Sequence, residues 1–330
     1  MMLARNLLRQ RQAQSGAFGP PGHQRQEDAF LQVVGHTAAV IGDFQADGQP
    51  VQLLADLDLM LGAAALLNGV NLAPFIFWAG FASVLFMFYG WFGTVIGESQ
   101  AGMYNADVDK SFRMGMMWFI FSEVMFFAAF FGALYYARNL SVPWLGGEGA
   151  KYLSNLFLWQ DFEPTWPTNG PAAVGGAFET IPAFGLPAVN TAILLTSGVT
   201  ITIAHHALQA GNRGILKLFL GLTFLLGFFF VYLQATEYAH AYHELNLTLG
   251  SGIYGSTFFM LTGFHGLHVT LGAIMLVVIW LRVMKGHFTP KQHFAFEAVA
   301  WYWHFVDVVW LFLFICIYIW FRGAGPVAGH

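Results

Sequence analysis

Charged residues and cysteines are scarce in this sequence. Only 10% of the 330 residues are Asp, Glu, Lys or Arg, against roughly 25% in an average soluble domain. A soluble protein of this size could not cover its surface with so few charges, so the composition excludes that class. The single cysteine, Cys316, excludes an intramolecular disulfide and a cluster of thiolate metal ligands within the chain. The modest net charge of −4 gives no sign of nucleic-acid binding, and we expect none.

Long apolar runs dominate the sequence instead. Hydrophobic residues make up 57% of the chain, and Phe alone occurs 35 times. A helix needs roughly 20 apolar residues to cross a hydrocarbon core of about 30 Å. Runs of that kind lie near 72–97, 114–136, 188–210, 215–236, 254–281 and 297–321, and a weaker one, broken by two aspartates, lies at 51–69. The sequence therefore predicts an all-α integral membrane protein with seven transmembrane helices, of which the first is the least certain.

The distribution of Lys and Arg supports seven spans over six. With seven spans and the N-terminus inside, eleven of the fourteen basic residues fall on the inner side and three on the outer side. Without the first span the count becomes seven against seven. Because membrane proteins concentrate Lys and Arg in their cytoplasmic segments, we predict seven helices and a cytoplasmic N-terminus.

The segments outside the spans divide the chain into two parts. Residues 1–50 form an N-terminal extension that begins MMLARNLLRQRQAQ, which is Arg-rich, free of acids and similar to a mitochondrial presequence. We expect it to be disordered or presequence-like. Residues 51–330 form the membrane domain, which includes a long outer loop at 137–187 rich in Gly, Pro and Trp. We interpret this loop as a packed cap rather than as a functional loop.

Ionisable residues inside membrane spans are rare and usually face the interior of a helix bundle. This chain has nine of them: Glu123, His205, His206, Glu237, His265, His268, Glu297, His304 and Asp307. Two readings are open, ligation of a metal or haem and hydrogen bonding between helices. The adjacent His205 and His206 point about 100° apart and cannot both reach one metal. We favour hydrogen bonding and predict buried structural roles and no metal.

Two further groups stand out by their position relative to the membrane. Glu123 lies ten residues beyond Arg113, roughly 15 Å into the bilayer at about 1.5 Å per residue. It is either a proton-handling carboxyl or a neutral acid that is hydrogen-bonded to another helix. The inner cluster of Arg282, Lys285 and His287 either binds anionic lipid head groups or follows the ordinary positive-inside pattern. Two alternative functions follow from these groups, a bis-histidine haem protein and a proton channel that uses Glu123.

Six segments of the sequence carry a family resemblance. They are VIGES (95–99), RMGMMWFIFSEVMFF (113–127), TIAHHAL (202–208), LQATEY (233–238), YGSTFFMLTGFHGLHV (254–269) and HFAFEAVAWYWHFVDVVWLF (293–312). In this order they resemble subunit III of the haem–copper cytochrome c oxidases, and the long outer loop is more similar to bacterial members. Only the N-terminal part of the sequence differs from the family pattern. Residues 1–59 lack the family's Trp-Pro that leads into an uninterrupted first helix, and the pattern resumes at MLGAAALLNG (60–69).

The resemblance implies seven helices in two bundles, of two and five, separated by a V-shaped cleft that holds phospholipids. It also implies that this subunit has no redox centre, the haem and copper lying in partner subunits of an aa3-type oxidase that reduces O2 to water and pumps protons. The subunit would contact subunit I, share the complex with subunit II, and support proton uptake and oxygen access. The complex would take electrons from cytochrome c or a similar donor. The expected location is a bacterial inner membrane, with the mitochondrial inner membrane as the alternative.

The resemblance also assigns roles to individual positions. Glu123 matches the family's carbodiimide-reactive carboxyl. Three positions match the neighbourhood of the lipid cleft, and they are Glu98, Arg113 and Arg282. Four match polar family positions within or at the ends of helices, and they are Glu237, Glu297, His304 and Asp307. To the lipid-binding group we add Lys285 and His287, because they follow Arg282 on the inner side.

Overall fold

The computed structural model describes residues 50–320, with side chains from residue 57 onward. The predictions for residues 1–49, including the presequence-like leader, lie outside the described residues. Residues 50–320 form helices and turns and contain no β-strand. The chain divides after Met103 into two compact units, which hold two and five of the predicted spans. The V-shaped cleft between the two parts stays a prediction.

The first unit is a pair of helices, α3 (Pro50–Leu67) and α4 (Ala73–Gln100). Glycines permit their close approach, since a Cβ at Gly80 would lie 2.5 Å from the backbone nitrogen of Leu59. Small residues serve this purpose at membrane helix contacts. Helix α4 is long and apolar enough to cross a membrane, whereas the apolar part of α3 is the shorter stretch Leu57–Leu67. The seven-helix prediction is confirmed, with the first helix the least typical.

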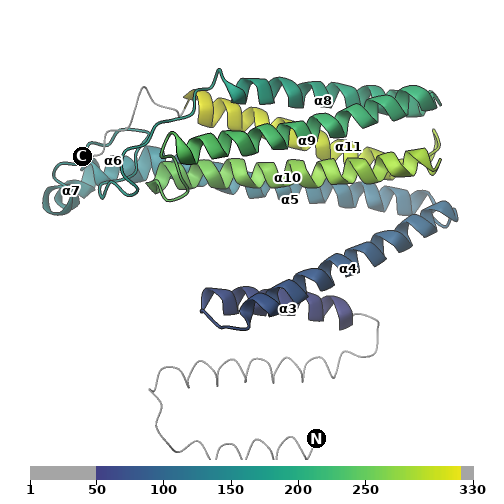
Figure 1. The fold of residues 1–330 in the computed structure, drawn as a ribbon, viewed down its shortest axis with the longest axis horizontal. Coiled ribbons are helices and arrows are strands. Elements are labelled where there is room, and N and C mark those ends of the chain that lie inside the picture. Colours follow the sequence, from purple (N-terminus) through teal and green to yellow (C-terminus); the bar gives the residue numbers. More distant parts are fainter. Residues whose placement is uncertain (1–49, 321–330) are drawn as a thin grey trace, which may run out of the picture. The chain divides into compact units, whose positions relative to one another are not determined.

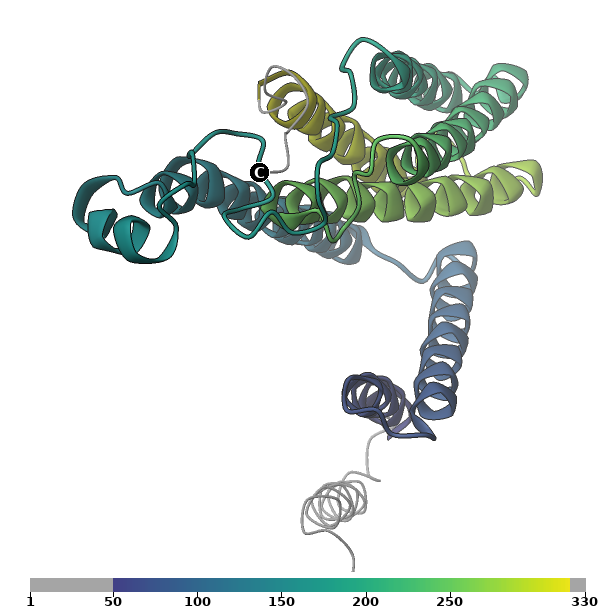
Figure 2. The ribbon, with the colours of Figure 1, turned by 60° about the vertical axis from the view of Figure 1, so that its left-hand side comes forward.

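The second unit contains the other five spans (Figure 1). These are α5 (Ala106–Tyr136), α8 (Leu186–Gln209), α9 (Arg213–His243), α10 (Gly252–Met284) and α11 (Phe294–Leu313). Helix α8 packs against α9 and α11, helix α10 packs against α9 and α11, and α5 packs against α10 and α11. Figure 2 shows the same bundle from a second direction. The start of α5, the α8–α9 turn and the α10–α11 turn lie together at one end of the bundle, which we call the inner end (Figure 1).

The helices extend beyond the apolar runs that predicted them. Helix α5 begins at Ala106 rather than near residue 114, because the Asn105 side chain caps it by accepting from the backbone N–H of Val108 at 2.9 Å. Two aspartates, Asp107 and Asp109, lie in its first turn. Their negative charges stabilise the positive end of the helix dipole. A run of apolar residues predicts only the part of a helix that lies in the hydrocarbon core. The polar first turn of α5 was therefore not predicted.

The outer loop is shorter and more structured than predicted. Helical backbone continues past Tyr136 through the π-helix η1 (Ala137–Ser141) and α6 (Val142–Leu145). The 3₁₀-helix η2 (Gly149–Lys151) and α7 (Tyr152–Leu158) follow. The remainder packs on the α9–α10 turn, where the Asn246 side chain donates to the carbonyl oxygens of Gly175 and Ala177 at 2.9 and 2.8 Å. The interpretation of this loop as a packed cap stays a prediction.

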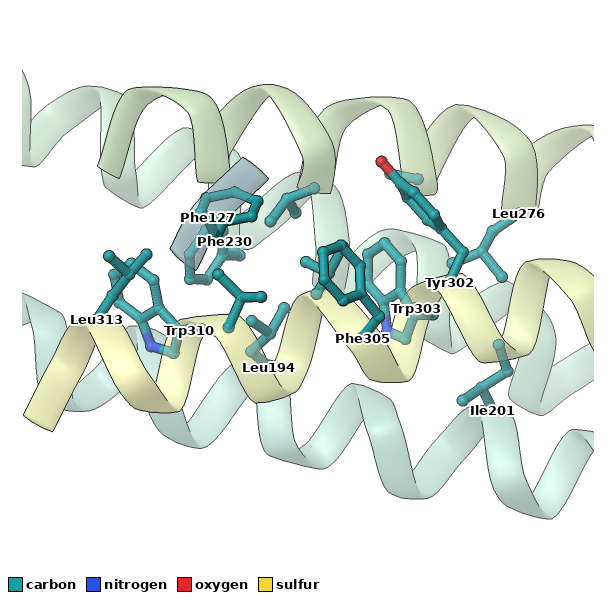
Figure 3. Close-up of a cluster of buried hydrophobic side chains, with 14 of the residues drawn as sticks. Phe127, Leu194, Ile201, Phe230, Leu276, Tyr302, Trp303, Phe305, Trp310 and Leu313 are labelled. Carbon is teal, nitrogen blue, oxygen red and sulfur yellow. The ribbon is translucent and has the colours of Figure 1, made fainter. Parts of the chain in front are cut away.

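Trp303 of α11 lies in the middle of the core of the second unit (Figure 3). Its ring fits between two glycines: a Cβ at Gly227 of α9 would lie 2.5 Å from the ring, and one at Gly272 of α10 would lie 2.9 Å from it. Its indole N–H donates to Ser197 Oγ of α8 at 2.9 Å. Trp303 thus contacts three other helices at once. Helix α11 then continues into the π-helix η3 (Phe314–Trp320).

Candidate functional site

Glu123, the deepest acidic residue of α5, has a partner on another helix. Its Oε2 lies 2.9 Å from Nε2 of His268 on α10. The His268 Nδ1 lies 2.6 Å from the carbonyl oxygen of Phe264. Both side chains are largely buried, with exposed fractions of 23% for Glu123 and 11% for His268. The structure therefore brings together two residues that the sequence singled out separately.

The Phe264 carbonyl determines where the protons of this pair are. A carbonyl oxygen only accepts, so Nδ1 of His268 carries a proton and donates to it. The short contact between Nε2 and the Glu123 oxygen then requires one more proton, which belongs either to a neutral carboxyl or to an imidazolium that faces a carboxylate. Glu123 and His268 therefore share one proton in a position from which it can transfer.

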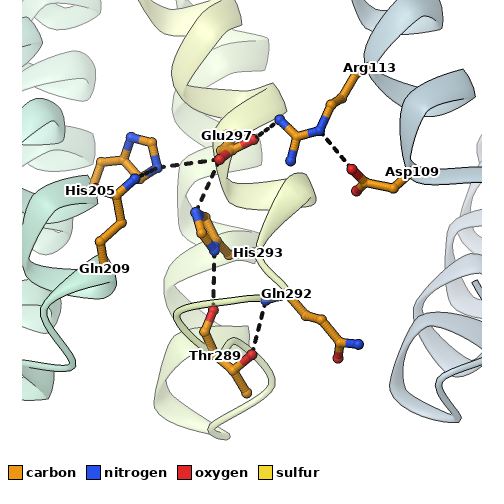
Figure 4. A network of polar contacts seen from close by, with 8 residues as sticks. All are labelled: Asp109, Arg113, His205, Gln209, Thr289, Gln292, His293 and Glu297. Carbon is orange, nitrogen blue, oxygen red and sulfur yellow. Dashed lines mark hydrogen bonds and ion pairs between the residues drawn. The ribbon is translucent and has the colours of Figure 1, made fainter. Parts of the chain in front are cut away.

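Four residues meet at the inner end of the bundle (Figure 4). Glu297 of α11 forms an ion pair with Arg113 of α5 through Oε2, and its Oε1 faces Nε2 of His293 at 3.1 Å and Nε2 of His205 at 3.7 Å. Arg113 also contacts Asp109, one turn earlier on α5, at 2.8 Å. We call Arg113, His205, His293 and Glu297 the inner polar cluster.

A group of basic residues lies around Phe288 at the same end of the second unit. The Arg282 guanidinium lies over the Phe288 ring, 4.5 Å from its centroid, and Arg213 donates to the Phe288 carbonyl oxygen at 2.6 Å. Buried nitrogens of these two arginines, Nη1 of Arg213 and Nε of Arg282, make no hydrogen bond to the described residues. Burial and then the charges of Arg282 and Lys285 lower the pKa of the nearby His287. The positive charge of this group favours the binding of an anion.

Glu237, the acidic residue of α9, accepts hydrogen bonds from two side chains. Its Oε1 accepts from the Tyr318 hydroxyl of η3 at 2.6 Å and from Gln234 at 3.2 Å. On α10, Nε2 of His265 donates to the Val306 carbonyl oxygen at 3.1 Å. The Tyr318–Glu237 and His265–Val306 contacts join different helices, whereas the Gln234–Glu237 contact lies within α9.

The His304–Asp307 pair differs from its prediction. The carboxylate of Asp307 is buried, but Nδ1 of His304 lies 3.8 Å from it, which is longer than a hydrogen bond. The His304 side chain is 46% exposed and reaches Thr202 Oγ1 of α8 at 3.4 Å instead. Asp307 is close-packed against the backbone of α8, since a Cβ at Gly198 would overlap its Oδ2. Asp307 is therefore buried between α8 and α11, whereas His304 lies at the surface of the bundle.

Two predicted residues stand apart from these contacts, and several unpredicted ones join them. Glu98 is half-buried in the last turn of α4, in the first unit. His206 is exposed on α8, its ring 6.4 Å from that of His205. The sequence reading missed four contributors: Asp109, Arg213, His293 and Tyr318. The i, i+4 spacings of Asp109 with Arg113 and of His293 with Glu297 could have revealed two of them.

Comparison with known proteins decides the family. The profile described as Cytochrome c oxidase subunit III matches residues 49–322. The chain belongs to that family. It is 45% identical to Cytochrome c oxidase subunit 3 of Dugong dugon and of Felis catus, over 73% of this chain and 82% of each relative. It is also 45% identical to the protein of the same description from Oncorhynchus nerka, over 72% and 80%.

Membership of the subunit III family confirms the resemblance drawn from the six sequence motifs. It makes the chain a membrane subunit of an oxidase complex of the respiratory chain. The expected affinity with bacterial members is not supported, because these relatives come from vertebrates. The length of the outer loop was a weak criterion, since loop lengths vary readily among homologues.

Proposed function

We propose that this chain is the non-catalytic subunit III of an aa3-type cytochrome c oxidase and that it stabilises the catalytic subunit I. Haem and copper lie in the partner subunits, subunit II belongs to the same complex, and cytochrome c or a similar protein supplies the electrons. The observation that carries the proposal is the family match over residues 49–322.

The side of α5 that faces away from the other helices of the second unit is suited to contact a protein partner within the membrane. Five large apolar side chains there are left uncovered by the second unit, with exposed fractions from 46% to 66%: Met114, Met117, Trp118, Phe121 and Met125. Their spacing places them along one side of the helix. Trp and Met are both enriched at protein interfaces. We assign this face to the contact with subunit I.

The basic group around Phe288 supports phospholipid binding. Arg213, Arg282 and Lys285 bring positive charge together there, which attracts an anionic phosphate, and His287 lies beside them. We include Glu98 and Arg113 among the lipid-binding residues on the family resemblance alone.

Glu123 supports a role in proton uptake. The carboxyl shares one proton with His268 and lies within a membrane helix, where it would react with a hydrophobic carbodiimide. We propose that this pair assists proton delivery to subunit I, while the lipids give oxygen an apolar route. The location that fits is the inner membrane of a bacterium or mitochondrion, with the inner end on the cytoplasmic or matrix side.

Affinity purification from detergent-solubilised membranes tests this proposal. We expect a tagged chain to be recovered with a haem-bearing partner, whose spectrum is unchanged when the tagged chain is stripped away. The stripped complex should lose activity faster during turnover. Recovery of the chain without a haem-bearing partner, or a haem spectrum in the isolated chain, would refute the assignment.

A further inference from the structure

The inner polar cluster brings three potential metal ligands together from two helices. Nε2 of His205, Nε2 of His293 and Oε1 of Glu297 all lie within 4.8 Å of one another. His205 lies near the end of α8, whereas His293 and Glu297 lie one turn apart at the start of α11. The described fold, and not the local sequence alone, therefore creates this group.

The backbone around His293 leaves its Nε2 free to act as a ligand. Nδ1 lies 3.2 Å from the Thr289 carbonyl oxygen, which only accepts, so Nδ1 carries the proton of the neutral ring. Nε2 is then the ring nitrogen available to a metal once it is deprotonated, and this buried atom makes no hydrogen bond to the described residues. A histidine that donates one ring N–H to a backbone carbonyl and offers the other nitrogen has the usual form of a metal ligand.

His205 is oriented in the same sense. Its Nε2 lies 3.3 Å from the side-chain nitrogen of Gln209, one turn later on α8. The amide nitrogen of a glutamine only donates, so Nε2 of His205 accepts this hydrogen bond and is unprotonated, and a metal would take its lone pair in place of Gln209. Its side chain is 26% exposed, which leaves room for the ring to turn towards Glu297.

The distances from Glu297 to the two histidines suit a tetrahedral ion. Bond lengths of about 2.0–2.2 Å to zinc place neighbouring ligand atoms about 3.3 Å apart. The Glu297 Oε1 lies 3.1 Å from the His293 nitrogen and 3.7 Å from the His205 nitrogen. At 3.1 Å the His293 nitrogen and the Glu297 oxygen need a positive charge between them, which a proton on Nε2 supplies in the absence of metal and a bound cation supplies in its place.

Arg113 does not remove Glu297 from such a site. The guanidinium binds the other oxygen, Oε2, and leaves Oε1 towards the two histidines. Asp109 contacts the same guanidinium at 2.8 Å and balances its charge. Arg113 therefore holds the carboxylate in position, as the outer contacts of metal-binding carboxylates do.

We propose that His205, His293 and Glu297 form a binding site for a divalent transition-metal ion, with zinc as the ion that suits the donors best. Two imidazoles and one carboxylate leave a fourth position for water, a ligand set that zinc commonly adopts. The absence of thiolates disfavours softer ions. The site lies at the inner end of the bundle and joins α8 to α11, so the bound ion would fix the two helices together. This proposal does not depend on the proposed role of Glu123.

Zinc binding to the intact oxidase complex tests the site. The complex is treated with a chelator and dialysed against micromolar zinc alone, and the metal bound is measured by mass spectrometry. We expect the wild-type complex to bind one more zinc than the His293→Gln complex, or to bind it at least about tenfold more tightly. His240→Gln is the matched control, because His240 is exposed near the end of α9 and should leave zinc binding unchanged.

Two further measurements keep the proposal open to refutation. If His293→Gln does not assemble, His205→Gln takes its place, since that side chain is more exposed and its loss should be tolerated. X-ray absorption at the zinc edge should show two imidazole nitrogens and one carboxylate oxygen at about 2.0–2.2 Å. Equal zinc uptake by the wild type and both histidine variants would overturn the proposal.

Discussion

Oε2 of Glu123 and Nε2 of His268 lie 2.9 Å apart across the contact between α5 and α10, although 145 residues separate them in the sequence. The Phe264 carbonyl fixes the proton on the other ring nitrogen, so this contact holds one proton between two groups that can each carry it. The pair joins packing to chemistry, because α5 and α10 have to be correctly placed before the proton can be shared.

Removal of either member of this pair should destabilise the second unit. Glu123→Gln and His268→Gln should each cost about 1–3 kcal/mol, because each leaves a buried polar partner unsatisfied. The double variant should cost less than the sum of the two single variants, with a coupling of about 0.5–3 kcal/mol. Unfolding of the purified subunit in increasing SDS measures these values. Strictly additive costs would contradict the shared proton.

The two glycines beside Trp303 provide a second test. Gly272→Ala places a methyl group 2.9 Å from the buried ring, and overpacking of this kind costs about 1–3 kcal/mol. Gly266→Ala is the control on the same helix, since a Cβ there meets nothing within 4 Å. We expect Gly272→Ala to lower the thermal stability of the subunit and Gly266→Ala to leave it unchanged or raise it. Equal effects would mean that the ring yields to the methyl group.

The hydrogen bond from Tyr318 to Glu237 provides a third test of the structure. Tyr318→Phe removes the only hydroxyl that donates to this carboxyl among the described residues and should cost about 1–3 kcal/mol, because the carboxyl stays buried. Tyr232→Phe on α9 is the control, since its ring is 62% exposed. The comparison uses the same SDS unfolding measurement, and a Tyr318→Phe variant as stable as the control would show that water reaches Glu237.

His287 should report on bound lipid. Burial and the charges of Arg282 and Lys285 lower its pKa below the usual value of about 6.5. The folded chain therefore holds this proton less tightly than the unfolded chain, and His287 lowers stability as the pH falls below about 6.5. An anionic phosphate beside the two cations should raise the pKa again. NMR titration of the histidines, first in neutral detergent and then with added anionic phospholipid, measures the shift.

A charge variant serves as the internal standard for that titration. Lys285→Gln removes one of the two cations and should raise the pKa of His287 in neutral detergent, without any lipid. In this variant the further rise on addition of anionic lipid should be smaller. A His287 pKa that responds to Lys285→Gln but not to anionic lipid would place the lipid elsewhere.

The sequence predicted the architecture because hydropathy and charge act locally. Apolar runs identify helices that cross a membrane, and the Lys and Arg count identified the first helix despite its two aspartates. The ends of the helices were less accurate. At α5 the error arose because the Asn105 cap and a polar first turn carry no apolar signal.

The sequence predicted individual residues of the candidate sites, but not which of these residues lie together. Glu123 and Glu297 were both recognised, but their partners His268 and His205 lie on other helices, and no local pattern states how helices pack. His304 and Asp307 were both predicted to be buried, but the His304 side chain is 46% exposed and only Asp307 is buried. Spacing along one helix shows which residues share a face, but not what that face contacts.

The position of Trp303 between Gly227 and Gly272 also bears on how the chain is made. Helices α8, α9 and α10 are synthesised before α11, and together they form a slot whose walls are a serine and two glycines. Until the ribosome has delivered residue 303, that slot is unfilled, and the three earlier helices lack the one side chain that contacts all of them at this point. The last span therefore completes the packing of helices that entered the membrane before it, and a nascent chain that stops short of it should be a substrate for membrane quality control.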